Sequence, residues 1–561
     1  MFVFVVFIVY CLFCIKFFLL RVMSLQDLPY ELLNYTLKKV RFNPLLALRQ
    51  TSVDYRNVAT VALANKKLQF TCPLGVTKDS KNLPYSSQRT NWLDVPFVTT
   101  PTNLEIKSSF DLWVVEKSLQ GITHLYIDNW DYLTNVSAFG NLHTLNINGC
   151  KYLRDVSALG NLHTLALISA WQLTDVSALG NLHTLNLSHA YLLTNVCALG
   201  NLHTLHLRYC KLLTNVNSLG NVHTLDLTYC QDLSDVSALG NVHTLDLSYC
   251  QDLSDVSALG NVHTLDLSGC QRLTDVSALG NVHTLDLSFC HFLTDASALV
   301  NVHTLDLSGC ETLTDVSALG KVHTLNLSGC DEISDVSALG GVYDLNLSEC
   351  LEIENVSALG KVHKLNLYSC SNITDVSALN GVQFLDLACC SEITGASFLG
   401  NVYDLNLYGC RITDVSPFYR VHTFRFGSSE ITDVSSLSEV NTLYLDYCSG
   451  ITDVSALGKV KELKLTHCDG ITDVSALGGV NDLDLSNCPK ITDVSALGRV
   501  TKLNLSNCFG ITDVSALGGV QDLDLSYCTA ISSVGALANV PKLSVTGCNT
   551  IVLTLVKMFK K

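Results

Sequence analysis

Cysteine, histidine, aspartate and serine recur along this chain at a spacing of 20 residues, and each of these side chains can take part in catalysis or bind a metal ion. The unit Asn261–Gly280, NVHTLDLSGCQRLTDVSALG, shows the arrangement, and similar units stand before and after it. We number positions within a unit from Asn261 as position 1 to Gly280 as position 20. Such regularity is compatible with a metal array, a disulfide ladder, a series of catalytic groups or plain stacking of repeats.

The cysteines favour a packing role. The chain has 23 cysteines, and most of them occupy position 10, from Cys150 to Cys548. Ala170, Ala190 and Ser429 stand at the same position in other units. Alanine can pack there but cannot bind a metal, so we interpret the cysteine as an inward-facing residue whose thiol donates weakly to a backbone carbonyl. So many unpaired thiols are typical of a reducing compartment.

Histidine occupies position 3 in an unbroken run from His143 to His323. Adjacent imidazoles should lie about 5 Å apart along one edge, where they could bind metal or respond to pH. Later units carry other side chains there: Tyr343, Gln383, Asn441 and Lys461. We therefore predict a solvated ladder without a metal, in which clustered imidazoles lower one another's proton affinity.

The recurrence of aspartate, histidine and serine could suggest a hydrolase. A catalytic triad, however, needs one unique arrangement with an oxyanion site, and not about twenty copies on a regular surface. We predict no catalytic residue, no cofactor and no metal site. The pair Thr274 and Asp275 is predicted to cap the turn DVSAL with its side-chain oxygens, and Asn215 and Ser533 keep this chemistry in other units.

The apolar positions indicate the local fold. In this unit they are Val262, Leu265, Leu267, Cys270, Leu273, Val276 and Leu279. The step of two between Leu265 and Leu267 predicts a short strand with both side chains facing inward, and the steps of three predict tight 3₁₀-like or irregular turns. A single coil of this kind cannot cover its apolar side, so successive coils must stack with parallel strands about 4.8 Å apart.

The pattern V-x-x-L-x-L-x-x-C-x-x-L resembles the leucine-rich-repeat signature over residues 121–548, in about 22 units. The resemblance implies an α/β repeat solenoid: a leucine-rich-repeat array of short parallel strands and tight 3₁₀ or irregular turns. Units 401–419 and 420–438 each lack one residue. Near-identity among the units in 221–340 indicates recent tandem duplication, as in expanded families of protists and their large viruses.

The outward-facing strand residues and the residue at position 9, just after the strand, form the predicted target-binding surface. The aspartates at position 6 should attract a basic or polar protein, whereas the formal net charge of −16 disfavours nucleic acid. Neutral drift in an exposed turn is the alternative explanation for the variety at position 9. The predicted target-contacting residues are Asp226, Asp246, Asp266, Asp286 and Asp306 at position 6, and Tyr209, Tyr229, Tyr249, Phe289 and Tyr447 at position 9.

Residues 24–70 show helical apolar spacing and no repeat. They resemble an F-box, the helical motif that docks on an Skp1-type adaptor of cullin ubiquitin ligases. The resemblance is carried by Leu28-Pro29, Glu31-Leu32-Leu33, Leu37, Val40, Asn43-Pro44, Leu45, Leu46, Leu48, Arg49-Gln50, Ser52 and Tyr55-Arg56. It implies adaptor contacts through Leu28, Pro29, Leu32, Leu33, Leu45, Leu46 and Leu48. A helical cap of the solenoid is the alternative. The turn C-x-x-[IL]-T-D is similar to that of F-box/leucine-rich-repeat proteins, whose units are usually longer.

We therefore expect five segments: an apolar N-terminal segment that is a signal anchor or a mis-assigned start before Met23 (1–22), a small helical F-box-like domain (23–70), a linker and N-terminal cap (71–120), the repeats (121–548) and a C-terminal tail (549–561). The leading hypothesis is a cytoplasmic, non-enzymatic substrate receptor of an SCF-type ubiquitin ligase, with an Skp1-like adaptor and a protein target as partners. The alternative is a membrane-anchored or secreted recognition protein that uses residues 1–22 and acceptor sequons such as Asn135-Val136-Ser137.

Overall fold

The computed structural model describes residues 69–70, 102–106, 122–127 and 133–549. The apolar segment 1–22, all seven predicted adaptor-binding residues and nearly all of the F-box-like segment lie outside these ranges. The described residues contain no helix that is long and apolar enough to cross a membrane. The chain divides into two compact units, Met1–Ala190 and Tyr191–Lys561.

The first unit contains a parallel sheet with short 3₁₀ turns. Its strands are β1 (Gln69–Phe70), β2 (Thr102–Ile106), β3 (Ile122–Ile127), β4 (Thr144–Asn148), β5 (Thr164–Ile168) and β6 (Thr184–Asn186), and its turns are η2 (Ser137–Phe139), η3 (Ser157–Leu159) and η4 (Ser177–Leu179). Each strand pairs in parallel with the next from β1 to β6. Strand β2 lies within 71–120, so strand pairing reaches into the segment for which we expect a linker and cap.

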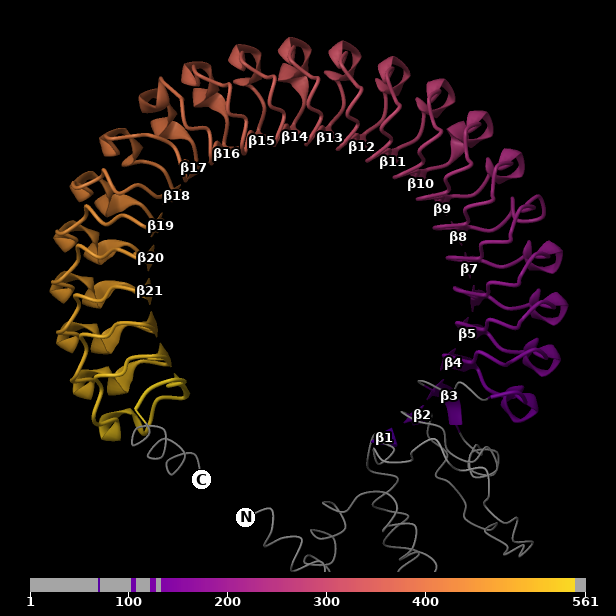
Figure 1. Cartoon of the computed structure of the whole chain (residues 1–561), viewed down its shortest axis with the longest axis horizontal. Coiled ribbons are helices and arrows are strands. Elements are labelled where there is room, and N and C mark those ends of the chain that lie inside the picture. The colour runs from indigo at the N-terminus through magenta and orange to yellow at the C-terminus, as the bar shows by residue number, and fades with distance from the viewer. Residues whose placement is uncertain (1–68, 71–101, 107–121, 128–132, 550–561) are drawn as a thin grey trace, which may run out of the picture. The chain divides into compact units, whose positions relative to one another are not determined.

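The second unit repeats one coil of a strand, a turn and a 3₁₀ segment. Its strands are β7 (Thr204–His206), β8 (Thr224–Asp226), β9 (Thr244–Asp246), β10 (Thr264–Asp266), β11 (Thr284–Asp286), β12 (Thr304–Asp306), β13 (Thr324–Asn326), β14 (Asp344–Asn346), β15 (Lys364–Asn366), β16 (Phe384–Asp386), β17 (Asp404–Asn406), β18 (Thr423–Phe426), β19 (Thr442–Leu445), β20 (Glu462–Lys464), β21 (Asp482–Asp484), β22 (Lys502–Asn504), β23 (Asp522–Asp524) and β24 (Lys542–Ser544). Its 3₁₀ segments are η5 (Cys197–Leu199), η6 (Ser237–Leu239), η7 (Ser257–Asn261), η8 (Ser277–Leu279), η9 (Ser297–Leu299), η10 (Ser317–Leu319), η11 (Ser337–Gly341), η12 (Ser357–Leu359), η13 (Ser377–Gly381), η14 (Ala396–Asn401), η15 (Ser416–Phe418), η16 (Ser435–Glu439), η17 (Ser455–Lys459), η18 (Ser475–Gly479), η19 (Ser495–Arg499), η20 (Ser515–Gly519) and η21 (Gly535–Leu537). Within this unit the strands line the inner side of the stacked coils and the 3₁₀ segments line the outer side (Figure 1).

The register places equivalent residues of successive coils beside one another. Between β10 and β11, for example, Leu265 pairs with Leu285 and Asp266 pairs with Asp286. A side chain at a given position therefore has the same position of the next coil as its neighbour, at the strand spacing of about 4.8 Å. Rows of like residues follow directly from the 20-residue period.

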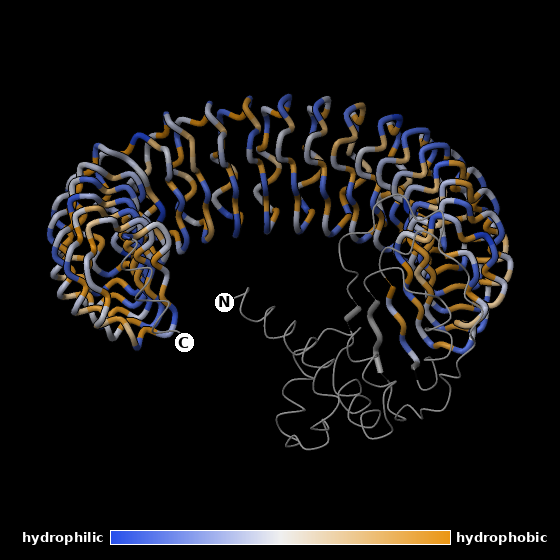
Figure 2. Tube along the Cα trace, turned by 60° about the horizontal axis from the view of Figure 1, so that its bottom comes forward, coloured by the Kyte–Doolittle hydropathy of each residue, from blue (hydrophilic) through white to orange (hydrophobic). Residues whose placement is uncertain are grey.

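The seven apolar positions form the core. In the unit Asn261–Gly280 each of the seven is at most 2% exposed. Hydrophobic segments recur at the same place in successive coils (Figure 2). Burying one leucine side chain contributes roughly 1.5–3 kcal/mol, so the stacked core stabilises the array without metal or disulfide bonds. The predicted fold class, a leucine-rich-repeat solenoid of parallel strands and 3₁₀ turns, is confirmed.

An aspartate or asparagine precedes most of the 3₁₀ segments. The Ser277 N–H donates to Asp275 Oδ1 at 2.9 Å, and the Asn217 N–H donates in the same way to Asn215 Oδ1 at 3.0 Å. This is an Asx-turn, in which a side-chain oxygen accepts from the backbone two residues on. Of the predicted Thr-Asp cap, the aspartate makes this contact.

Unit 420–438 corrects one expectation. Ser429 is exposed, so the interpretation that it replaces the inward cysteine is wrong. The buried Phe426 and Ile431 are five residues apart, whereas the equivalent Leu267 and Leu273 are six apart. With one residue fewer to span the same gap, the chain runs outside the position that cysteine fills elsewhere. The Ser428 N–H faces the next coil and donates to Cys448 Sγ at 3.5 Å.

Candidate binding face

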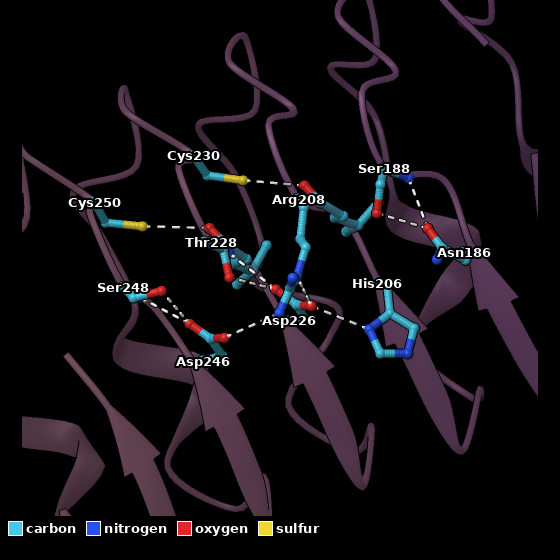
Figure 3. A network of polar contacts seen from close by, with 12 residues as sticks. Asn186, Ser188, His206, Arg208, Asp226, Thr228, Cys230, Asp246, Ser248 and Cys250 are labelled. Carbon is cyan, nitrogen blue, oxygen red and sulfur yellow. Dashed lines mark hydrogen bonds and ion pairs between the residues drawn. The ribbon is translucent and has the colours of Figure 1, made fainter. Parts of the chain in front are cut away.

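The position-10 cysteines are packing residues. Cys230 Sγ donates to the Leu207 carbonyl at 3.3 Å, and Cys250 Sγ donates to the Leu227 carbonyl at 3.4 Å (Figure 3). Burial raises the pKa of Cys290 to about 12, so this thiol stays protonated at neutral pH and is a poor nucleophile or metal ligand. The predicted inward thiol that donates to a backbone carbonyl is confirmed.

The histidines of position 3 form a stacked edge. In the second unit the ring centroids of His203 and His223 lie 4.6 Å apart, and those of His263 and His283 lie 4.7 Å apart. Partial desolvation, followed by repulsion from the neighbouring imidazoles, lowers the pKa of His243. The predicted spacing is confirmed, and repulsion between neighbouring imidazoles contributes to the lowered pKa of His243. Within the described ranges, no group of three or more histidine, cysteine, aspartate or glutamate side chains is arranged to hold a metal ion.

The aspartates of position 6 use one carboxylate oxygen to end the strand. Asp246 Oδ1 accepts from the Ser248 N–H at 3.0 Å and from its hydroxyl at 2.6 Å (Figure 3). Asp306 Oδ1 accepts from Ser308 in the same way, at 2.8 and 2.6 Å. The second oxygen contacts side chains of other coils: Asp306 Oδ2 accepts from Asn326 Nδ2 at 2.8 Å, and Asp246 Oδ2 lies 3.6 Å from Arg208 Nη2. We call the outward residues at positions 4, 6 and 8 the strand face.

Asp226 is the exception on the strand face because other side chains cover it. Arg208 Nε donates to its Oδ2, and His206 Nδ1 lies 3.1 Å from the same atom (Figure 3). The Asp226 side chain is only 7% exposed. Burial opposes its ionisation, but hydrogen bonds from His206, Thr228 and Arg208 outweigh that effect and hold the pKa of Asp226 at about 2. The prediction that Asp226 presents a carboxylate to a partner is therefore wrong as regards its exposure.

Asp266 and Asp286 have the opposite environment. In the described part of the chain neither has a cationic side chain within ion-pair distance. Burial and the neighbouring carboxylates raise the pKa of Asp286, although its hydrogen bonds from Ser288 oppose the change. The same causes raise the pKa of Asp266. A cation placed over this row would relieve the repulsion between carboxylates.

Further along the second unit, the strand-face charges compensate one another. Lys364 Nζ lies 3.0 Å from Asp344 Oδ2, and Lys502 Nζ lies 2.9 Å from Asp482 Oδ2. These pairs join adjacent coils through position 4. In the part of the chain that the structure describes, the longest run of position-6 carboxylates without a cationic side chain at ion-pair distance is therefore Asp266, Asp286 and Asp306, on β10 to β12.

The residues of position 9, which we call the rim, have a left-handed backbone in nearly every described unit. Tyr209, Tyr229 and Tyr249 have φ of 58°, 58° and 59°. Their rings stack with centroids 4.5 Å apart. Phe289 and Tyr447 have the same conformation and are 49% and 54% exposed. A left-handed conformation costs a residue with a side chain roughly 1–2 kcal/mol. Sequence reasoning identified the exposed aromatic row but not this conformation.

The structure brings most of the predicted target-contacting residues together. Tyr229, Tyr249 and Phe289 follow strands β8, β9 and β11, which carry position-6 aspartates, and Tyr209 follows the adjacent strand β7. Tyr447 is apart from them, because it follows β19 and stacks on His467 with a centroid distance of 4.5 Å.

The structure also contains a groove in the rim that the sequence analysis did not predict. It has a volume of about 680 Å³ and is lined by Phe289, His291, Ser308, Gly309, Glu311, Ser328, Gly329, Asp331, Ser348, Glu349, Leu351 and Ser369. The sequence signal is the order of rim residues in four successive units, which runs phenylalanine, glycine, glycine and glutamate. Two rim positions without side chains leave the gap.

No family model matches the chain, and no curated protein matches it. Among solved structures, an internalin (inlF) from Listeria monocytogenes shares 21% sequence identity, with a TM-score of 0.28, over 57% of this chain and 83% of that chain. The functional domain of InlJ from Listeria monocytogenes, which includes a cysteine ladder, shares 19% identity, with a TM-score of 0.24, over 73% of this chain and 74% of that chain. These likenesses carry no argument about what the chain binds. What its own coils show is a leucine-rich-repeat solenoid.

Proposed function

We propose that the chain is a non-enzymatic protein that holds a protein partner against the strand face and rim of its second unit. The rim aromatics carry this proposal. Tyr209, Tyr229 and Tyr249 occupy a left-handed conformation that suits glycine, and the array does place glycine at this position in other coils, as at Gly269. Their stacking recovers part of the backbone cost. Large aromatic side chains on a rigid surface are the commonest anchors of protein interfaces.

The charge of the strand face supports a basic partner. The carboxylates of Asp266 and Asp286 lie side by side without a cationic side chain in the described residues. A lysine or arginine side chain of the partner would be attracted by both carboxylates. Nucleic acid is disfavoured because its phosphates would meet this row and the net charge of −16.

The rim can be tested with Tyr209→Gly/Tyr229→Gly/Tyr249→Gly. Glycine suits their backbone conformation, so this variant should fold while losing the three rings. Phe398→Ser is a matched control, because Phe398 is 59% exposed but belongs to η14 on the outer side. Proximity labelling in the native cell should identify a partner that the triple variant loses and the control keeps. If the wild-type chain, the triple variant and the control label the same partners, binding through the rim is refuted.

A finer proposal concerns the segment before the array. We infer that the chain is a substrate receptor of an SCF-type ubiquitin ligase, with an Skp1-like adaptor bound through Leu28, Pro29 and the other leucines of the F-box-like segment. The resemblance of residues 24–70 supports it. The protonated, buried thiols of the array suit a cytoplasmic location. The membrane-anchored or secreted alternative depends on residues 1–22.

The adaptor proposal is tested by co-purification. The chain begun at Met1 and the chain begun at Met23 are each expressed with an Skp1-type adaptor, and Leu28→Ala/Pro29→Ala is the control. Binding that the control loses supports the ligase receptor. Absence of binding, together with glycosylation of the Met1 form in membranes, supports the alternative recognition protein and contradicts the cytoplasmic location.

A further inference from the structure

The rim groove lies where two successive coils have no rim side chain. Gly309 and Gly329 occupy the rim with φ of 66° and 65°, between Phe289 on one side and Glu349 on the other. Three coil spacings separate the two flanking residues, which at about 4.8 Å each gives about 14 Å. The gap can therefore admit one extended peptide segment or a long side chain. Its volume of about 680 Å³ falls within the range of ligand sites, roughly 300–1,000 Å³.

The two glycines have different surroundings. A Cβ atom on Gly309 would lie 2.8 Å from Phe289 Cδ1, so the phenyl ring leans over this glycine and forms a wall of the groove. A Cβ atom on Gly329 would meet nothing closer than the Gly309 nitrogen at 4.0 Å. The open space of the groove therefore depends on Gly329.

The charged lining is acidic. Glu311, Asp331 and Glu349 contribute exposed carboxylates, and no lysine or arginine lines the groove. The Nδ1 atom of His291 is buried and accepts or donates no hydrogen bond in the described structure, although Glu311 Oε1 lies 3.5 Å away. The groove thus combines one aromatic face with three carboxylates that have no strong cationic partner.

We propose that this groove binds an arginine side chain carried by an extended segment of the protein partner. A guanidinium is planar, so it can stack on the Phe289 ring and also donate to a carboxylate through its fork of N–H groups. The serine hydroxyls of Ser308 and Ser328 add acceptors on the side toward the strand face. The inference rests on the proposed function and names the chemistry of the partner.

The groove also continues into the row of strand-face aspartates. Ser308, in its lining, is the residue that holds Asp306, and Asp286 lies on the next strand. A basic segment that leaves the groove in this direction meets further carboxylates. An apolar or acidic segment would instead leave the carboxylates of the groove without compensation. Charge complementarity therefore selects a basic segment.

The experiment measures the binding of a fluorescein-labelled peptide, Gly-Arg-Gly-Arg-Gly-Arg-Gly, to the full chain by fluorescence anisotropy at low salt. A peptide with glutamine in place of each arginine and one with lysine are run in parallel. Gly329→Tyr fills the groove, and Asn507→Tyr places the same ring on the same backbone conformation outside it, since Asn507 has φ of 61°. Glu311→Gln/Asp331→Asn/Glu349→Gln removes the charges of the lining. Its matched control, Glu354→Gln/Glu430→Gln/Asp469→Asn, removes three exposed charges outside the lining.

The arginine peptide should bind the wild-type chain more tightly than the lysine and glutamine peptides. Gly329→Tyr and the lining variant should each weaken it about tenfold, and the two controls should change it less than about twofold. Circular dichroism shows that each variant keeps its fold. Equal weakening by a variant and its control, or equal affinity for all three peptides, would overturn the inference. The proposed function has its own test in the rim tyrosines, so a partner lost there but kept by Gly329→Tyr would refute the groove alone.

Discussion

The same substitution at the same position of two coils should change stability in opposite directions. Asparagine already stands at position 6, where Asn346 Oδ1 accepts from the Ser348 N–H at 3.1 Å, so aspartate can be replaced without losing the strand-end hydrogen bond. In Asp226→Asn the change removes a carboxylate that Arg208 and His206 stabilise. In Asp286→Asn it removes one that neighbouring carboxylates destabilise.

The pKa of Asp226 gives the size of the stability change expected for Asp226→Asn. Its value of about 2, against an ordinary 3.8, means that the folded chain holds a proton there less tightly than the unfolded chain does. The carboxylate therefore adds stability above pH 4, about 2 kcal/mol at pH 7, and this contribution falls to about 1 kcal/mol at pH 3 as the group protonates. Asp226→Asn should lower local stability by that amount at pH 7 and by about half as much at pH 3.

The charged Asp286 carboxylate changes stability in the opposite direction. Its pKa is raised, so the folded chain holds the proton more tightly, and the charged form costs stability at neutral pH. Asp286→Asn should raise local stability at pH 7 by roughly 0.2–1 kcal/mol, the range for like charges on adjacent strands. The gain should disappear below the ordinary pKa of 3.8, where the carboxylate is protonated in both states.

Hydrogen exchange read by mass spectrometry suits this array, because coils open locally and a single unfolding temperature would average over them. Peptides from the coils of β8 and β11 report each substitution, and peptides from β22 serve as an internal reference. A loss of about 2 kcal/mol corresponds to about 30-fold faster exchange at pH 7. Changes of the same sign at both sites, or changes that do not vary between pH 7 and pH 3, would refute the electrostatic argument.

Two further predictions concern the rim and the thiols. Gly269→Ala should destabilise its coil by roughly 1–3 kcal/mol, because φ is 67° and the new Cβ would lie 2.6 Å from Tyr249 Cδ1. Gly329→Ala places its Cβ in open space and should cost about 1 kcal/mol less. Urea-dependent hydrogen exchange of the two coils distinguishes these effects. Iodoacetamide at pH 8 should modify the exposed Cys197 and Cys389 well before the buried position-10 thiols, and peptide mapping that finds position-10 cysteines modified first would contradict their packing role.

The interior of the array could be predicted from the sequence almost completely. The steps between Leu265, Leu267 and Cys270 fix a strand followed by a turn, and each coil must fit the one before it. The prediction failed where a unit changes length, because Ser429 was aligned by pattern while the chain had one residue fewer with which to reach it. Aligning the units by residue type does not predict the path of the backbone in a loop that is one residue shorter.

The strand face and the rim were harder to predict, because the environment of each residue there depends on the side chains of the neighbouring coils. Asp226 and Asp286 both follow the sequence Asn-Val-His-Thr-Leu in their units, and their environments differ because histidine stands at position 6 and arginine at position 8 of the unit before Asp226. Likewise, the left-handed rim conformation is compatible with tyrosine, glutamate and glycine alike. No rule that reads one residue and its near neighbours can separate these cases.

The groove shows how such an array can acquire specificity without changing its fold. Phe289, Gly309, Gly329 and Glu349 belong to four coils, and elsewhere along the rim glycine stands singly, as at Gly269 and Gly409. The wall exists because a ring leans over the following glycine, and the open space exists because a second glycine comes next. Tandem duplication supplies coils that already fit one another, so substitutions at the rim alone can create or fill a site. The order of the units, rather than any one unit, therefore determines what this surface can bind.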